Sequence, residues 1–204
     1  LSSGTLSPSS QTINYGATAT TINGTAATGG YSYPTYSYQW YSSPDNVNWT
    51  TISGATGQNY SPGILYTPTW FYRKVTETHT SSTASTSHVP VYVLPQLSCS
   101  LSPTSQTITY GQYATTITSS VSGGNGSYSY AWKSSPDGSS WTSTGVATAN
   151  YSPGNLGTTT YYQLIASSNG ATCTSSPSHV TVNHLPTGTL SVTSTTPSGN
   201  GTIN

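Results

Sequence analysis

The chain has 204 residues, with three Lys or Arg, three Asp or Glu and a net charge of zero at pH 7. So few charges exclude nucleic-acid binding through a basic patch and disorder driven by charge repulsion. No apolar run approaches the roughly 18 residues that a membrane-spanning helix needs, so we expect no membrane insertion.

The sequence repeats itself at an interval of slightly more than 90 residues. The motif that begins at Gln11 returns at Gln106, displaced by 95 positions, and Trp40 returns as Trp132, displaced by 92. The tripeptide Ser87-His88-Val89 returns 91 positions later. Because the displacement changes only between motifs, we expect the insertions in loops. Such self-similarity predicts a tandem array of small domains.

The boundaries of the repeats are marked by a recurring Leu-Pro pair, at Leu94-Pro95 and at Leu185-Pro186. After the second pair, Gly188-Thr-Leu repeats the opening Gly4-Thr-Leu. The sequence therefore predicts a first domain over residues 1–95, a second over 96–186, and the opening strands of a truncated third over 187–204. We expect the chain to be part of a longer polypeptide with further repeats.

Short strand patterns separated by turn residues fill each repeat, and no amphipathic helix is predicted. Strands are predicted over 20–23, 36–40, 71–75 and 89–93 in the first repeat, and over 115–118, 128–132, 161–165 and 179–183 in the second. Alternate residues of a strand share a face, so Tyr38 and Trp40 point together, as do Tyr130 and Trp132. We expect these four side chains in the cores.

A tight turn is predicted after each Trp-containing strand. Pro44-Asp45 and Pro136-Asp137-Gly138 occupy equivalent positions, where Pro fixes φ near −65° and Gly permits a tight reversal. Asn46 replaces the Gly in the first repeat and also tolerates left-handed geometry. We expect each Asp to accept hydrogen bonds from backbone N–H groups of its own turn.

These elements predict the fold class. About seven short strands in roughly 90 residues, with a Trp on the third strand, fit a two-sheet immunoglobulin-like sandwich. The chain is therefore predicted to be all-β, with tandem immunoglobulin-like (Ig-like) β-sandwich domains joined by short Pro-containing linkers.

Few side chains could carry out chemistry. The carboxylates are Asp45, Glu77 and Asp137. We expect Glu77 at a solvated strand edge beside His79, and His88 and His179 as repeat equivalents with structural or surface roles. No spacing resembles a zinc or calcium site, and no nucleophile motif occurs. The sequence therefore predicts no enzymatic activity, no catalytic residue, no metal and no cofactor.

Four motifs follow one another in the repeats: Tyr-x-Trp-x-x-Ser-x-Asp-Gly-x-x-Trp, Tyr-Ser-Pro-Gly-x-Leu, Thr-Thr-Tyr-Tyr and Ser-x-Val-x-Val. This pattern resembles the Ig-like repeats of very long secreted surface proteins of Bacteroidota. Proteins with such arrays include gliding-motility adhesins and surface-filament proteins exported by the type IX secretion route. The resemblance covers residues 4–186, and the first repeat departs from it at 68–72. It implies an extracellular, cell-surface location and a structural or adhesive role.

The resemblance also bears on the two cysteines. Cys99, on the opening strand of the second repeat, and Cys173, near its last hairpin, stand where such repeats often carry a Cys, which implies a disulfide in an oxidising compartment. Two buried free thiols are the alternative. The displacement puts Gly4 and Ser82 at the corresponding positions, so we expect the first repeat to fold without this bridge.

Two functions without catalysis follow. In the first, each domain is a rigid spacer in a stalk or fibre, and the nearly uncharged surface favours lateral association with other copies of the chain. In the second, exposed aromatic side chains bind glycans, or proteins, of another cell. The candidate glycan contacts are Tyr31, Tyr33 and Tyr41, in a loop or on an outward-facing strand position.

Overall fold

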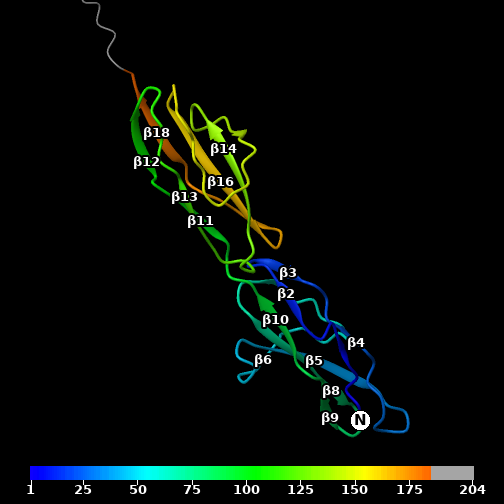
Figure 1. The fold of residues 1–204 in the computed structure, drawn as a ribbon. Coiled ribbons are helices and arrows are strands. Elements are labelled where there is room, and N and C mark those ends of the chain that lie inside the picture. Colours follow the sequence, from blue (N-terminus) through cyan, green and yellow to red (C-terminus); the bar gives the residue numbers. More distant parts are fainter. Residues whose placement is uncertain (185–204) are drawn as a thin grey trace, which may run out of the picture.

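The computed structural model describes residues 1–184, which form two all-β units without a helix. Figure 1 shows these units end to end, with the N-terminus at the far end of the first. The all-β class and the tandem Ig-like architecture predicted from the sequence are confirmed. Residues 1–95 are here called repeat 1 and residues 96–184 repeat 2, after the boundary that the sequence predicts. The predicted opening of a third domain, residues 187–204, lies outside the described residues.

Repeat 1 is a sandwich of two sheets. In one layer, β1 pairs with β4 and β3 with β7, and single bridges join Ser2 to Thr28 and Ile22 to Tyr60. The other layer has the order β2-β10-β8-β5-β6, with β9 also paired to β8. The strands are β1 Leu6–Ser7, β2 Gln11–Ile13, β3 Ala17–Ala19, β4 Asn23–Gly24, β5 Tyr36–Ser43, β6 Thr50–Thr51, β7 Gly63–Leu65, β8 Thr69–Glu77, β9 Thr83–Ser85 and β10 Val89–Val93.

Repeat 2 has the same topology. Its first layer pairs β11 with β13, and bridges join Ile117 to Tyr151 and Tyr113 to Asn155. Its second layer has the order β12-β18-β16-β14-β15, with β17 also paired to β16. The strands are β11 Ser98–Ser102, β12 Ser105–Thr109, β13 Thr118–Ser122, β14 Ser129–Ser135, β15 Thr142–Ser143, β16 Thr160–Ser168, β17 Ala171–Thr174 and β18 Ser178–Asn183.

Each repeat has its own hydrophobic core around one tryptophan. Trp40 and Trp132 are fully buried, and their indole N–H groups donate to the carbonyls of Gly57 and Thr148, at 2.8 Å in both repeats. A buried indole N–H requires such a partner. The two cores are separate clusters, so each repeat is an independently packed unit.

Most predicted strands form, but those over 20–23 and 115–118 are interrupted. There the chain pairs through the single bridges of Ile22 and Ile117 before β4 and β13 begin. The departure of repeat 1 from the family pattern at 68–72 does not change the strand register. Trp70 lies opposite Ser43, as Tyr161 lies opposite Ser135.

The equivalence expected between His88 and His179 is wrong. In the sheets, Val91 lies opposite Thr69 and Val180 lies opposite Thr160. Because Thr69 and Thr160 are equivalent, the displacement along the last strand is 180 − 91 = 89 positions, two fewer than the repeated Ser-His-Val tripeptide indicates. His179 therefore occupies the place of Pro90.

The two-residue difference arises in the hairpin before the last strand. Ten residues separate the paired Lys74 and Ser85 in repeat 1, whereas eight separate Ile165 and Thr174 in repeat 2. Consequently the residue that corresponds to Cys173 is Ala84, and the expected correspondence with Ser82 is wrong.

Candidate functional site

The predicted turn residues organise both hairpins. Asp45 Oδ1 accepts hydrogen bonds from the backbone N–H groups of Asn48 and Val47, at 2.7 and 2.9 Å. The Asn48 N–H above all holds the pKa of Asp45 well below its ordinary range. Asp137 makes the same contacts with Ser140 and Ser139, which lower its pKa likewise. Both carboxylates are thus committed to their turns.

Asn46 and Gly138 follow these aspartates and both have positive φ, 61° and 74°. Pro44 and Pro136 precede the aspartates. The turns of the two repeats therefore use the same geometry with different residues at the left-handed position.

The end of repeat 1 that lies away from repeat 2 carries two enlarged loops, here called the tip. Its first loop has five residues between Gly30 and Tyr36, where repeat 2 has three between Gly124 and Tyr128. In both repeats the tyrosine hydroxyl donates to the carbonyl of the first of the two glycines before the loop, Gly29 or Gly123. The second loop of the tip is the longer hairpin between β8 and β9.

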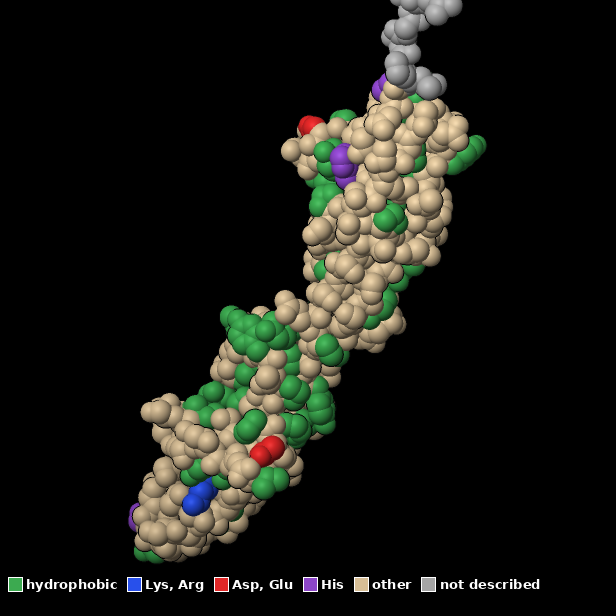
Figure 2. All heavy atoms as spheres, turned by 90° about the vertical axis from the view of Figure 1, so that its left-hand side faces the viewer, with side chains coloured by type: hydrophobic (Ala, Val, Ile, Leu, Met, Phe, Trp, Pro, Cys, Tyr) green, Lys and Arg blue, Asp and Glu red, His purple; other side chains and the backbone are tan. Residues whose placement is uncertain are grey.

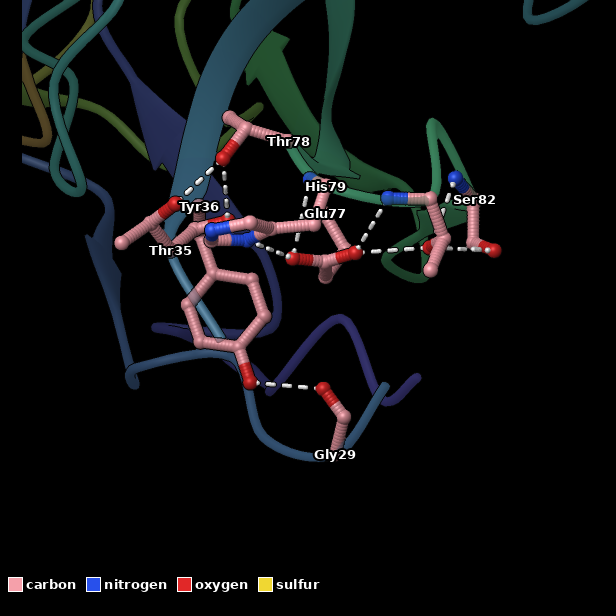
Figure 3. Close-up of polar contacts among 8 residues, drawn as sticks. Gly29, Thr35, Tyr36, Glu77, Thr78, His79 and Ser82 are labelled. Carbon is pink, nitrogen blue, oxygen red and sulfur yellow. Dashed lines mark hydrogen bonds and ion pairs between the residues drawn. The ribbon is translucent and has the colours of Figure 1, made fainter. Parts of the chain in front are cut away.

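Glu77 holds this second loop and is fully buried, so its expected place at a solvated edge is wrong. Figure 3 shows its carboxylate directed into the loop. Oε1 accepts from His79 N–H at 3.1 Å and contacts Nδ1 of the same residue at 2.8 Å. Oε2 accepts from the N–H and the hydroxyl of Thr80, at 2.8 and 2.6 Å.

The first loop lies directly on Glu77. Gly30 has φ +100°, and a Cβ at this position would be 2.9 Å from Cγ of Glu77, so only glycine permits the approach. The side chains of Thr35 and Thr78 also share a hydrogen bond between the loops (Figure 3). The carboxylate of Glu77 therefore holds the second loop, and the first loop packs on the same side chain.

We expect the tip to loosen in acid. Hydrogen bonds to its carboxylate lower the pKa of Glu77 from 4.5 to about 2, and the bond from the Thr80 hydroxyl has the largest effect. A carboxyl group with a depressed folded-state pKa stabilises the fold above its ordinary pKa and loses this contribution as pH falls. The protection factors of the amides of residues 77–82, which are corrected for the intrinsic pH dependence of exchange, should fall between pH 4.5 and 2. Glu77→Gln should remove most of this pH dependence, and an unchanged profile would contradict the assignment.

The predicted glycan-contact residues lie in different parts of repeat 1. Tyr31 and Tyr33 lie on the tip and are 51% and 84% exposed, and the Tyr31 ring stacks on His79 with centroids 4.9 Å apart. Tyr41 lies in the outer face of the larger sheet, where it stacks on Tyr72. The three tyrosines therefore do not form one site.

Arg73 is fully buried in repeat 1, a role that we did not predict from the sequence. Its guanidinium donates to the carbonyls of Gln58, Ser3 and Thr25, at 2.7, 2.6 and 2.7 Å. The Cζ atom lies 4.5 Å from the ring centroid of Tyr38. Burial lowers the pKa of Arg73, yet arginine stays protonated at neutral pH. This side chain ties the larger sheet to the edge of the smaller one.

A signal for this arrangement is present in the sequence. Arg73 alternates with Phe71 and Val75, so it must face the core, and its equivalent in repeat 2 is Leu164. A Cβ on Gly24 would be 2.1 Å from an Arg73 nitrogen, whereas repeat 2 has Ser119 at that place. Repeat 1 therefore combines Arg73 with Gly24, whereas repeat 2 combines Leu164 with Ser119.

Repeat 2 joins the corresponding strands covalently. A disulfide links Cys99 on β11 to Cys173 on β17, with Cα atoms 6.0 Å apart. In repeat 1 the segment before β1 is joined to β9 by a hydrogen bond from the Ser3 hydroxyl to the Ser85 carbonyl, at 3.1 Å, beside the Arg73 contacts. The two repeats thus use different means to close the same sandwich.

The repeats meet at a hydrogen-bonded junction. Asn14 Nδ2 donates to the carbonyl of Asn169 at 2.8 Å, and Asn169 Nδ2 donates back to Asn14 Oδ1 at 3.3 Å. The Gly124 N–H donates to the carbonyl of Pro95 at 2.8 Å. The loops of repeat 2 that correspond to the tip of repeat 1 are therefore occupied by the junction.

Residues 1–184 contain no helix long and apolar enough to cross a membrane. In the same part of the chain, no three His, Cys, Asp or Glu side chains converge as metal ligands would.

The fold and these contacts define a tandem Ig-like β-sandwich protein. Over residues 2–95 and 100–184 the sequence matches the family described as Domain of unknown function (DUF8696), and the chain belongs to this family. No curated protein matches the sequence.

Solved structures similar to this chain include N-terminal Ig domains of Dscam proteins. The four domains of Dscam1 isoform 6.9 are 15% identical, with a TM-score of 0.39, over 86% of this chain and 44% of that chain. The eight domains of DSCAM isoform 1.30.30 are 14% identical, with a TM-score of 0.38, over 86% of this chain and 25% of that chain. This chain spans less than half the length of either structure.

Proposed function

We propose that the chain is a rigid structural segment of an extracellular, cell-surface fibre and that it performs no catalysis. The observation that carries this proposal is the junction between the repeats. A connection of a few residues, reinforced by side-chain and backbone hydrogen bonds, favours a fixed angle between neighbouring domains, whereas a flexible linker would let them reorient. A chain of such units transmits force and holds its far end away from its anchor.

The absence of catalysis is part of the same proposal. Two of the three carboxylates bind their own turns, and the third binds the loop of the tip. General acid–base catalysis requires a group that is free to exchange a proton with a substrate. None of these carboxylates is free to exchange a proton with a substrate.

We also propose the setting that the sequence resemblance implies. The chain would belong to a Bacteroidota surface fibre that is secreted by the type IX route.

We expect the substitution Gly123→Ala to loosen the junction. A Cβ at Gly123 would lie 2.0 Å from the carbonyl oxygen of Gln96 in the linker, so the backbones must separate. Spin labels on the two repeats, read by pulsed electron paramagnetic resonance, should give one narrow distance distribution for the wild type and a broad one for the variant.

The matched control is Gly126→Ala. Gly123 and Gly126 both have φ +84°, but a Cβ at Gly126 meets nothing within 4 Å. The backbone strain is therefore similar, and only the contact with the linker differs. A broad distribution in the wild type, or equal broadening by both substitutions, would refute the rigid junction.

The tip of repeat 1 favours a second function, the binding of glycans on another cell. Its loops are rich in Tyr, Ser, Gly and Thr, a composition that recognition loops use for rigid, amphipathic contacts. Tyr33 protrudes at 84% exposure, and the buried Glu77 fixes the loops beneath it. Binding to a glycan array that disappears on Tyr33→Ala would support this function, and no binding by the wild type would refute it.

A further inference from the structure

The outer face of the larger sheet of repeat 1 carries a group of aromatic side chains, here called the aromatic face. Figure 2 shows hydrophobic side chains gathered on repeat 1, the lower unit, and sparser on repeat 2. The aromatic face consists of Tyr41, Trp49, Trp70, Tyr72, His88 and Tyr92.

These side chains order one another. Tyr41 and Tyr72 face each other across β5 and β8, with ring centroids 4.8 Å apart and planes inclined by 3°. Trp49 packs edge-on against Tyr72 at 4.6 Å and also contacts His88 at 4.5 Å. Asn46 Oδ1 fixes the His88 ring through Nδ1 at 2.7 Å. The face is therefore organised before any partner binds, which lowers the entropy cost of binding.

The fold does not require the three tyrosines of the aromatic face, although Trp49 and Trp70 correspond to Trp141 and Tyr161 in repeat 2. In repeat 2 the positions of Tyr41, Tyr72 and Tyr92 are occupied by Lys133, Gln163 and Thr181, and the same sheet forms. The face therefore fits a role in contact rather than in folding.

The geometry of the rings indicates the kind of partner. A sugar stacks on an open ring face, but Tyr41 and Tyr72 each cover one face of the other ring, and Trp49 packs edge-on against Tyr72. Within residues 1–184 the tyrosine hydroxyls that make hydrogen bonds are those of Tyr36, Tyr38 and Tyr128. The hydroxyls of the aromatic face remain available to a polar, uncharged protein surface.

We propose that the aromatic face binds the same face of a second copy of this chain. Protein interfaces are enriched in Tyr and Trp and depleted of charge at their centres, and beside the aromatic face the sheet presents one charged side chain, Lys74. The chain has a net charge of zero, so two copies do not repel each other. A face that meets its own copy forms a closed two-fold dimer.

The size of the sheet fits a weak, reversible contact. Five strands in the order β2-β10-β8-β5-β6, spaced about 4.8 Å apart and up to nine residues long at about 3.3 Å per residue, give a flat area of roughly 500 Å². Stable interfaces bury about 800 Å² per partner, and transient ones bury less. Association along a fibre would gain strength from many such contacts.

Sedimentation equilibrium of the full chain tests this inference, which rests on the proposed function as a fibre segment. The wild type should approach twice its mass of 21.2 kDa as its concentration rises. The double variant Tyr72→Gln, Tyr92→Thr carries the residues of repeat 2 at these positions and should fold normally. Its association constant should fall by at least about tenfold. Tyr113→Thr, which removes a 76% exposed tyrosine of repeat 2, should dimerise like the wild type.

Two results would overturn the inference. Equal association of the wild type and the double variant would place the contact elsewhere on the chain. A wild type that stays monomeric at all concentrations would exclude self-association. Either result leaves the rigid fibre segment intact, because the distance distribution between the repeats is measured within a single chain.

Discussion

Replacing Arg73 with alanine should destabilise repeat 1 by about 3 kcal/mol. The substitution leaves the carbonyls of Ser3, Thr25 and Gln58 without their donor and opens a cavity above Tyr38. Hydrogen exchange with mass spectrometry on the full chain reads the two repeats separately. Peptides of β5, β8 and β10 should lose protection, and those of repeat 2 should keep theirs.

Lys74→Ala is the matched control for this substitution. Lys74 is the next residue in the same strand but points to the outer face, so its truncation should change stability by no more than about 0.5 kcal/mol. Wild-type protection of repeat 1 in the Arg73→Ala variant would show that the guanidinium contacts do not hold the sandwich together.

Reduction of the disulfide should destabilise repeat 2 and leave repeat 1 unchanged, the reverse of the effect of Arg73→Ala. The bond joins residues separated by 74 positions, and closure of a loop of this length stabilises the folded state by about 4 kcal/mol in the chain-entropy description. Repeat 2 should therefore lose about this amount when a thiol reductant is added. Repeat 1 contains no cysteine and should keep its stability in the same sample.

The double variant Cys99→Ala, Cys173→Ala distinguishes the effect of losing the disulfide from any other effect of the reductant. It should unfold like the reduced wild type, and the reductant should not change it further. If both repeats lost protection together in reduced wild-type protein, their stabilities would be coupled through the junction, and the independence of the two cores would be refuted.

The sequence alone was sufficient for the architecture. The displacement of Trp40 to Trp132 revealed two units, and alternation with turn residues placed most strands. These features are local, because side-chain period and turn chemistry depend on neighbouring residues. The Asp-containing turns follow from the same local chemistry.

The burial of Arg73 and Glu77 was not recognised in the sequence, although alternation with Phe71 and Val75 places both toward the core. A charged residue can be buried only where partners are available. Arg73 finds two of its partners 70 and 48 residues earlier in the chain. Pattern reasoning does not reveal such distant carbonyls, whereas the tertiary structure brings them to the guanidinium.

The last strand shows most clearly what the tertiary structure decides. A slip of two residues returns every side chain of a strand to the same face, so the repeated Ser-His-Val tripeptide fits either register equally well. The shorter hairpin of repeat 2 selects the displacement of 89 positions and places Cys173 opposite Ala166. The local pattern therefore fixed which face each residue occupies, and only the pairing between strands fixed which residues correspond.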